Sequence, residues 1–163
     1  MKNKNVLQKI GIVFVLSQII NLTNCNQDGN DLPGLEEKVP ASIIDNIQPD
    51  GLLMISASQL QTFYVSKYNN IEYDIAVDDQ NIIIYIGTQD SNFVTEDKLR
   101  VGDPLALALE NAISELMLES GWAYYVELKS GWKAMFTTGP HMTDSIPKPD
   151  SPIRLFFKRS RTY

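Results

Sequence analysis

The chain has 163 residues, of which 20 are acidic and 14 basic, and its net charge of −6 excludes nucleic acid as a partner. A protein binds a phosphate backbone chiefly by neutralising it with Lys and Arg, whereas an acidic domain repels it. The single cysteine excludes an internal disulfide.

Residues 1–24 have the layout of a secretory signal. Three lysines precede or flank an apolar run from Ile10 to Leu16, which is shorter than the about 20 residues that span a bilayer. The run leads to Leu-Thr-Asn-Cys at residues 22–25, which resembles the lipobox of bacterial lipoproteins, with Asn24 where the family usually has Gly, Ala or Ser. The resemblance implies cleavage before Cys25 and a thioether-linked diacylglycerol on that cysteine.

A lipid on Cys25 predicts a protein held on a membrane of the bacterial cell envelope, on the periplasmic or the surface side. Two or more acyl chains anchor a protein stably, because each buried CH₂ contributes about 0.8 kcal/mol. An ordinary cleaved signal peptide and an uncleaved one are the alternatives. Residues 25–50 are polar and carry three prolines, which predicts a flexible tether in front of a single domain over residues 51–163.

The first half of the domain is expected to hold a helix and a hairpin. Residues 58–68 are predicted to form the helix, although the stretch from Thr62 to Val65 would also suit a strand. Strict alternation predicts a strand over residues 71–77, and residues 82–86 are apolar on both sides, which is typical of a central strand.

The second half is expected to repeat this order. Asp103 and Pro104 suit the N-cap and first position of a helix, apolar residues recur at spacings of three and four up to Met117, and Gly121 suits the C′ position. A hairpin over residues 122–136, with Gly131 in the left-handed position of its loop, and a last strand over residues 153–158 follow.

The tandem helix-plus-hairpin layout resembles the architecture of the β-lactamase inhibitor protein and of the small outer-membrane assembly lipoproteins of the SmpA type. The resemblance implies an α+β fold, in which two helix-plus-hairpin repeats form one antiparallel sheet with the helices packed on one face. It also implies a protein-binding module as the function.

One face of the second hairpin is the candidate partner surface. Tyr125 and Met135 lie on it beside Glu127 and Lys133, and Tyr and Met are enriched at protein contacts. In the alternative arrangement the helices cover this face, and the opposite face with Trp122, Trp132 and Phe136 points outward.

The sequence contains no set of residues with the spacing of a known catalytic or metal site, and it implies no cofactor. His141 and Asp144 are fewer than the three or four ligands of a stable metal site. Asp90 to Asn92 with Glu96 favours a turn, and the acidic stripe of Glu72, Asp74 and Asp78 favours a solvated strand face. We therefore expect a non-enzymatic protein with a protein partner; the alternatives are a surface lipoprotein that contacts host or environmental ligands and an enzyme of unrecognised type.

Overall fold

In the computed structural model, which describes residues 34–39 and 48–160, the chain forms one curled antiparallel sheet. The described residues contain one short helix, so the expected α+β fold with helices packed on the sheet is wrong. The elements are β1 (Gly51–Ser56), β2 (Gln59–Tyr68), β3 (Ile71–Val77), β4 (Ile83–Thr88), α2 (Leu105–Asn111), β5 (Met117–Glu119), β6 (Ala123–Glu127), β7 (Lys133–Phe136) and β8 (Leu155–Arg159).

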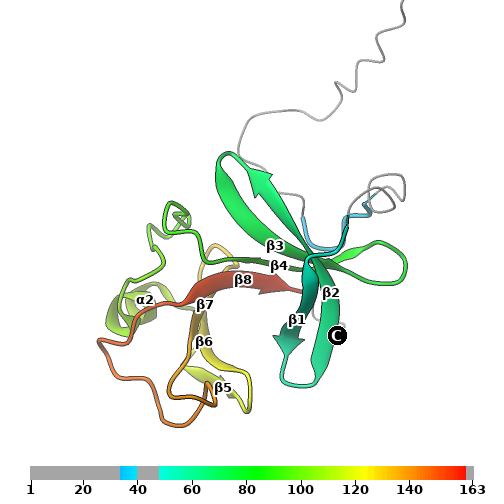
Figure 1. The fold of residues 1–163 in the computed structure, drawn as a ribbon. Coiled ribbons are helices and arrows are strands. Elements are labelled where there is room, and N and C mark those ends of the chain that lie inside the picture. The colour runs from blue at the N-terminus through cyan, green and yellow to red at the C-terminus, as the bar shows by residue number, and fades with distance from the viewer. Residues whose placement is uncertain (1–33, 40–47, 161–163) are drawn as a thin grey trace, which may run out of the picture.

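The strand order is β1-β2-β3-β4-β8-β7-β6-β5, so the last strand lies in the middle of the sheet and joins two meanders. Strand β2 is long enough to pair with β1 through its first half and with β3 through its second. Figure 1 shows the β1–β2 arm and the β5–β6 hairpin on the same side of β8. The sheet therefore curls and brings its two edges together.

The predicted first helix is strand β2, which corrects the first helix-plus-hairpin unit. Thr62, Phe63, Tyr64 and Val65 are β-branched or aromatic and fit a pleated surface better than a helix. The turn that follows has positive φ at Asn69 (49°) and Asn70 (64°), as a two-residue type I′ hairpin requires. This turn returns the chain directly as β3, and no helix intervenes.

The predicted second helix begins near the expected place, with a different start. Pro104 is the N-cap of α2 and no side chain caps the helix. The carboxylate of Asp103 instead accepts a hydrogen bond of 2.7 Å from the amide of Arg100, and this bond closes the turn before the helix.

The second helix also ends earlier than predicted, since Ala112 already has extended backbone angles. Ile113 donates its amide to the carbonyl of Glu127 at 2.7 Å, and Ser114 Oγ accepts the amide of Glu127 at 2.9 Å. These bonds draw the chain alongside β6, where it becomes edge strand β5. Gly121 has the expected left-handed φ (77°), but it lies in the β5–β6 turn and not at a helix end.

The alternating strands are confirmed. Strand β3 covers the predicted residues, and β4 is buried on both faces as expected of a central strand. Strands β6 and β7 form the second hairpin, and Gly131 takes a left-handed φ of 82° in its loop. The last strand, β8, begins two residues later than predicted.

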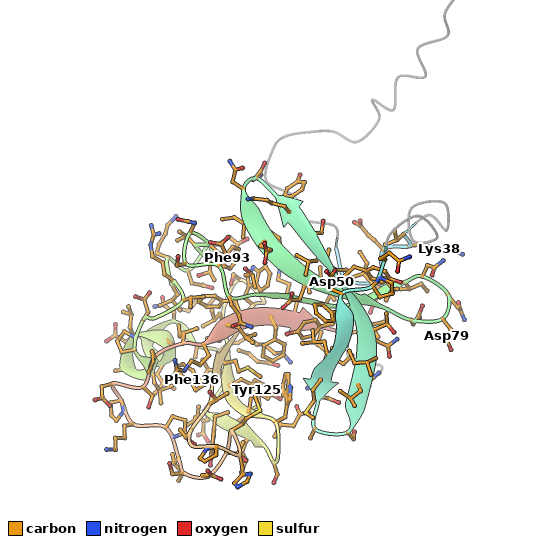
Figure 2. The ribbon with its side chains drawn as sticks, in the orientation of Figure 1. Lys38, Asp50, Asp79, Phe93, Tyr125 and Phe136 are labelled. Carbon is orange, nitrogen blue, oxygen red and sulfur yellow. The ribbon has the colours of Figure 1, made fainter. Side chains whose placement is uncertain are left out.

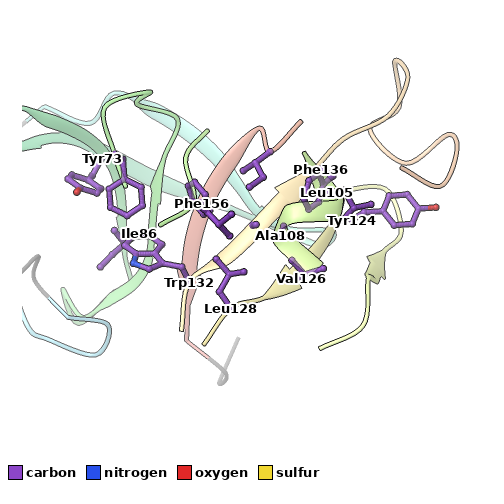
Figure 3. Close-up of a cluster of buried hydrophobic side chains, with 14 of the residues drawn as sticks. Tyr73, Ile86, Leu105, Ala108, Tyr124, Val126, Leu128, Trp132, Phe136 and Phe156 are labelled. Carbon is purple, nitrogen blue, oxygen red and sulfur yellow. The ribbon is translucent and has the colours of Figure 1, made fainter. Parts of the chain in front are cut away.

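Both faces of the sheet are buried, which a flat sheet with helices on one side does not require. The first cluster lies on the outer face, and Figure 3 shows it running from Tyr73 and Trp132 to Leu105 and Ala108 of α2. The second cluster fills the inside of the curl, with Ile55, Tyr85, Trp122, Met135 and Phe157 as its main members.

Candidate functional site

Three side chains hold the two edges of the curled sheet together, and we call Glu119, Trp122 and Arg159 the edge cluster. Arg159 forms an ion pair of 2.8 Å with Glu119 and donates a second bond to the carbonyl of Ile55 at 2.8 Å. Glu119 also accepts the amide of Ala57 at 2.7 Å.

Trp122 completes the edge cluster by donating its indole N–H to the carbonyl of Met54 at 2.8 Å. The Arg159 guanidinium lies 4.9 Å from the centre of its ring. Burial raises the pKa of Glu119, but the hydrogen bonds from Arg159 and Ala57 outweigh burial and leave this pKa below its ordinary value. Every charged group of the edge cluster is used by the fold.

The structure changes the candidate partner surface. Met135 is 2% exposed and belongs to the cluster inside the curl, so no partner reaches it in the folded protein. Tyr125 is half-buried beside it, with the Lys133 ammonium 5.2 Å from its ring centre, and Lys133 pairs with Glu127 at 2.9 Å. Figure 2 shows Tyr125 between β6, which carries it, and the β1–β2 arm. The sequence leaves open which of the two faces of this hairpin points outward, and the structure buries residues on both.

A larger pocket of about 770 Å³ lies on the outer face, at the end of the sheet away from α2, and we call it the aromatic pocket. Five separate parts of the chain line it. They are Gly34 and Glu37, the β2–β3 hairpin (Tyr68, Asn69, Ile71, Tyr73), the loop residues 92–96 with Lys98, Trp132 before β7, and Lys158 of β8.

The floor of the aromatic pocket is a set of contacting rings. Phe93 packs edge-on against Trp132 with ring centres 4.9 Å apart and against Tyr73 at 6.0 Å. These three rings are almost fully buried, while Tyr68 is half-buried at the rim. Burial, with the nearby charges of Asp90 and Glu96, raises the pKa of Tyr73 to about 12, so its hydroxyl keeps its proton at neutral pH.

The charges around the aromatic pocket are balanced in number. Two acids, Glu37 and Glu96, and two lysines, Lys98 and Lys158, line it. Within the described part of the chain, the ion pairs are Lys133–Glu127 and Arg159–Glu119, so none of these four side chains is paired. Lys158 places its ammonium 4.8 Å from the centre of the Trp132 ring.

The segment from Gly34 to Val39 forms part of the pocket wall because it is hydrogen-bonded to the start of β4. Glu36 donates its amide to the carbonyl of Ile83 at 2.9 Å, and Ile83 donates to the carbonyl of Glu37 at 2.9 Å. Leu35 and Val39 pack against the first cluster. This segment belongs to the stretch predicted as a flexible tether, and within it these six residues are docked on the sheet.

A smaller pocket of about 400 Å³ is lined by Glu72, Asp74, Gln89 and Asp90. Burial, and then repulsion from Glu72 and Asp50, raises the pKa of Asp74. Hydrogen bonds from the amides of Asn92 and Glu72 lower the pKa of Asp90. Asp90 therefore closes the loop after β4, which is the turn that the sequence favours.

His141 and Asp144, which by sequence make an incomplete metal site, lie in a surface loop. His141 is exposed, and its amide donates to the Asp144 carboxylate at 3.3 Å within a turn. Across residues 34–39 and 48–160, no group of three or more His, Cys, Asp or Glu side chains is placed to hold a metal. Cys25 and the predicted signal lie outside the described residues.

Sequence reasoning missed the aromatic pocket. Lys158 lies on the predicted last strand, but the sequence did not indicate that this strand is central or that Lys158 faces Trp132. Tyr68 was assigned to a helix, and Glu37 was placed in the tether. The Asn69-Asn70 pair is the local sequence signal of a hairpin there, because Asn tolerates the positive φ that a two-residue turn requires.

No family model matches the sequence, and no curated protein matches it. Among solved structures, the crystal structure of the uncharacterized protein yfeY from Escherichia coli is similar, with a TM-score of 0.49 and 17% sequence identity. The match covers 78% of this chain and 96% of that chain. In the part of the chain that the structure describes, no helix is long and apolar enough to cross a membrane.

Proposed function

We propose that this protein is a lipid-anchored binding module of the bacterial cell envelope, which holds its ligand in the aromatic pocket. The observation that carries the proposal is the set of unpaired charges, two of each sign, above a floor of packed aromatic rings. Ligand sites are usually concave and apolar, with a few convergent polar groups and volumes of about 300–1,000 Å³. The pocket of about 770 Å³ fits that description.

The lipobox-like sequence supports the anchor. The docked segment, which begins at Gly34, limits the distance between Cys25 and the pocket wall. Cys25 and Gly34 are nine residues apart, and a fully extended chain of that length spans about 30 Å. A lipid on Cys25 would therefore keep the pocket wall within about 30 Å of the membrane surface. The ligand of such a module is a component of the envelope or of the solution next to it.

The anchor is tested by Cys25→Ala. We expect this variant to lose metabolic labelling with a radioactive fatty acid and to move from the membrane fraction to the soluble fraction. The folded domain serves as the control, since its melting temperature should not change. Unchanged labelling and membrane retention would contradict the anchor.

The pocket is tested by photo-crosslinking in intact cells. We would place p-benzoylphenylalanine at Tyr68, on the pocket rim, and at Leu60, which is 59% exposed on the same strand and lines neither described pocket. An adduct of defined mass at Tyr68 and none at Leu60 would support the proposal. The same adducts at both positions, or none at either, would contradict it.

A further inference from the structure

The aromatic pocket is electrically neutral although the protein is acidic. Its two carboxylates and two ammonium groups cancel, and none of the four forms an ion pair with another described residue. An anionic ligand would meet Glu37 and Glu96, and a cationic ligand would meet Lys98 and Lys158, so neither sign of net charge is favoured. The pocket therefore fits a ligand without net charge.

Such a ligand must still be rich in hydroxyl or amide groups. The pocket's carboxylates accept hydrogen bonds, its ammonium groups donate them, and the protonated Tyr73 hydroxyl does both. A purely apolar ligand would leave these groups without water and without partners, at a cost in affinity. A hydroxyl group can bind to both kinds of side chain, because it donates a hydrogen bond to a carboxylate and accepts one from an ammonium group.

The ring floor adds a preference for a ligand with apolar faces. Tyr68 is half-buried and lines the pocket together with Tyr73, Phe93 and Trp132, which are almost fully buried. Electron-rich ring faces accept C–H groups of positive character. A pyranose ring presents such C–H groups on its faces and hydroxyls around its edge.

We propose that the ligand of the aromatic pocket is a neutral saccharide, bound with a sugar ring against the aromatic rim and with its hydroxyls on the unpaired charged side chains. This inference rests on the proposed binding function of the pocket. The saccharide could be a free envelope glycan or the headgroup of a glycolipid, since both present the same chemistry. The anchor distance admits both sources.

The sequence supplies a built-in reporter for this binding. Of the two tryptophans, Trp132 lines the pocket and Trp122 lies in the edge cluster. The Trp122→Phe variant therefore carries one tryptophan, in the pocket floor, and Trp132→Phe carries one outside it. A ligand that displaces the Lys158 ammonium from the Trp132 ring changes the emission of the first variant alone.

The first experiment titrates both single-tryptophan variants with millimolar tri-N-acetylglucosamine, maltotriose, glycerophosphoethanolamine and inorganic phosphate. We expect a saturable emission change in Trp122→Phe with one of the two oligosaccharides, and none in Trp132→Phe. A saturable response to the zwitterion or to phosphate alone would overturn the saccharide. A response of equal size in both variants would overturn the assignment to the pocket.

Variants of exposed pocket residues test the contacts. Glu96→Gln and Glu37→Gln, made in the Trp122→Phe background, should each weaken oligosaccharide binding about tenfold, as loss of one hydrogen bond to a charged group does. The matched control is Glu110→Gln, an exposed acid on α2 outside the pocket, which should leave the dissociation constant within about twofold. Unchanged binding in both pocket variants would overturn the proposal.

A vesicle-binding assay distinguishes the two sources of the saccharide, a free glycan and the headgroup of a glycolipid. Phosphatidylethanolamine vesicles with and without a neutral glycolipid are offered to the non-lipidated Cys25→Ala protein. Sedimentation only with the glycolipid, inhibited by the oligosaccharide, assigns the headgroup as the source, and binding of the soluble oligosaccharide alone assigns a free glycan. If Tyr68 gives its specific adduct in cells but no saccharide binds in either assay, the saccharide proposal is wrong and the proposed binding function stands. If Tyr68 gives no specific adduct, the proposed binding function itself is wrong.

Discussion

The edge cluster and the aromatic pocket contain similar groups and use them in opposite ways. Both place a cation next to a tryptophan ring, Arg159 at 4.9 Å from Trp122 and Lys158 at 4.8 Å from Trp132. In the edge cluster the cation also pairs with Glu119 and with a backbone carbonyl. In the pocket, Lys158 has no carboxylate partner among residues 34–39 and 48–160.

This difference separates residues that maintain the fold from residues that are available to a ligand. A buried or half-buried charge is retained at low cost only when its hydrogen-bonding groups are satisfied. The edge cluster meets this condition within the protein. The pocket charges meet it through solvent, or through a ligand that takes the place of solvent. We therefore expect substitutions in the edge cluster to change stability, and substitutions in the pocket to change binding.

The largest expected effect is that of Trp122→Ala. Trp122 is 2% exposed and packs edge-on against Phe157 at 5.0 Å, so its removal leaves a cavity between the two edges of the sheet. We expect a loss of about 3–5 kcal/mol in the free energy of unfolding, measured by urea denaturation. Trp122→Phe keeps most of the ring contacts and loses the bond to Met54, and should cost about 1 kcal/mol. Equal costs for the two variants would show that the ring packing is not what closes the sheet.

The ion pair of the edge cluster comes next. Arg159→Met leaves Glu119 half-buried without its partner, and we expect the free energy of unfolding to fall by about 2 kcal/mol. Lys129→Met is the matched control on an exposed loop and should change stability by less than about 0.5 kcal/mol. A loss in Arg159→Met no larger than in the control would remove the structural role of the pair.

The same pair predicts a pH dependence. The pKa of Glu119 in the folded protein lies below its ordinary value of about 4.3, so its contribution to stability is complete above that pH. The contribution is lost as the pH falls through the depressed folded pKa, because the carboxylate is protonated. The difference in unfolding free energy between the parent and Glu119→Gln should therefore be constant from pH 7 to about 5 and shrink below about 4. A difference that is unchanged down to pH 3 would contradict the assignment.

The pocket charges should behave differently from the edge cluster. Glu37→Gln and Lys98→Met replace exposed side chains that have no ion-pair partner in the described part of the chain, and each should change the free energy of unfolding by no more than about 0.5 kcal/mol. Urea denaturation of the two variants checks this. A loss above about 1 kcal/mol in either would place these charges with the edge cluster, as parts of the fold.

The sequence predicts the inner strands because their pattern is local. Polar and apolar residues alternate strictly in β3, and β4 is apolar on both faces. Each strand can therefore be predicted from its own residues, without information on the strands beside it. The segment from Ala112 to Glu119 has leucines and methionine at spacings that suit a helix as well as a strand. Its outcome is decided by two hydrogen bonds, from the Ile113 amide to the Glu127 carbonyl and from the Glu127 amide to Ser114 Oγ, and no local pattern records them.

The aromatic pocket was beyond prediction for a related reason. Trp132 and Lys158 meet because β8 lies between β4 and β7, and Glu37 joins them because its segment pairs with the start of β4. These are long-range pairings that follow from the topology. The burial of Met135 was not predicted, because alternation gives the face of a residue but not whether the sheet curls over that face.

The smallest expected effect concerns the smaller pocket, lined by Glu72, Asp74, Gln89 and Asp90, and distinguishes it from the edge cluster and the aromatic pocket. Burial, and then repulsion from Glu72 and Asp50, raises the folded pKa of Asp74 above its ordinary value of about 3.9, so its ionised form destabilises the folded protein at neutral pH. Asp74→Asn should therefore raise the free energy of unfolding at pH 7 by about 0.5 kcal/mol, a small gain because solvent screens the half-exposed charge. The gain should vanish below about pH 3.5, where Asp74 is protonated in the folded and the unfolded states alike. Asp79→Asn, on the exposed β3–β4 turn labelled in Figure 2, is the control and should change the free energy of unfolding at pH 7 by less than Asp74→Asn does. A loss of stability in Asp74→Asn at neutral pH would mean that the Asp74 carboxylate is used by the fold as the Glu119 carboxylate is, and the sheet would then have a second charged cluster that maintains it.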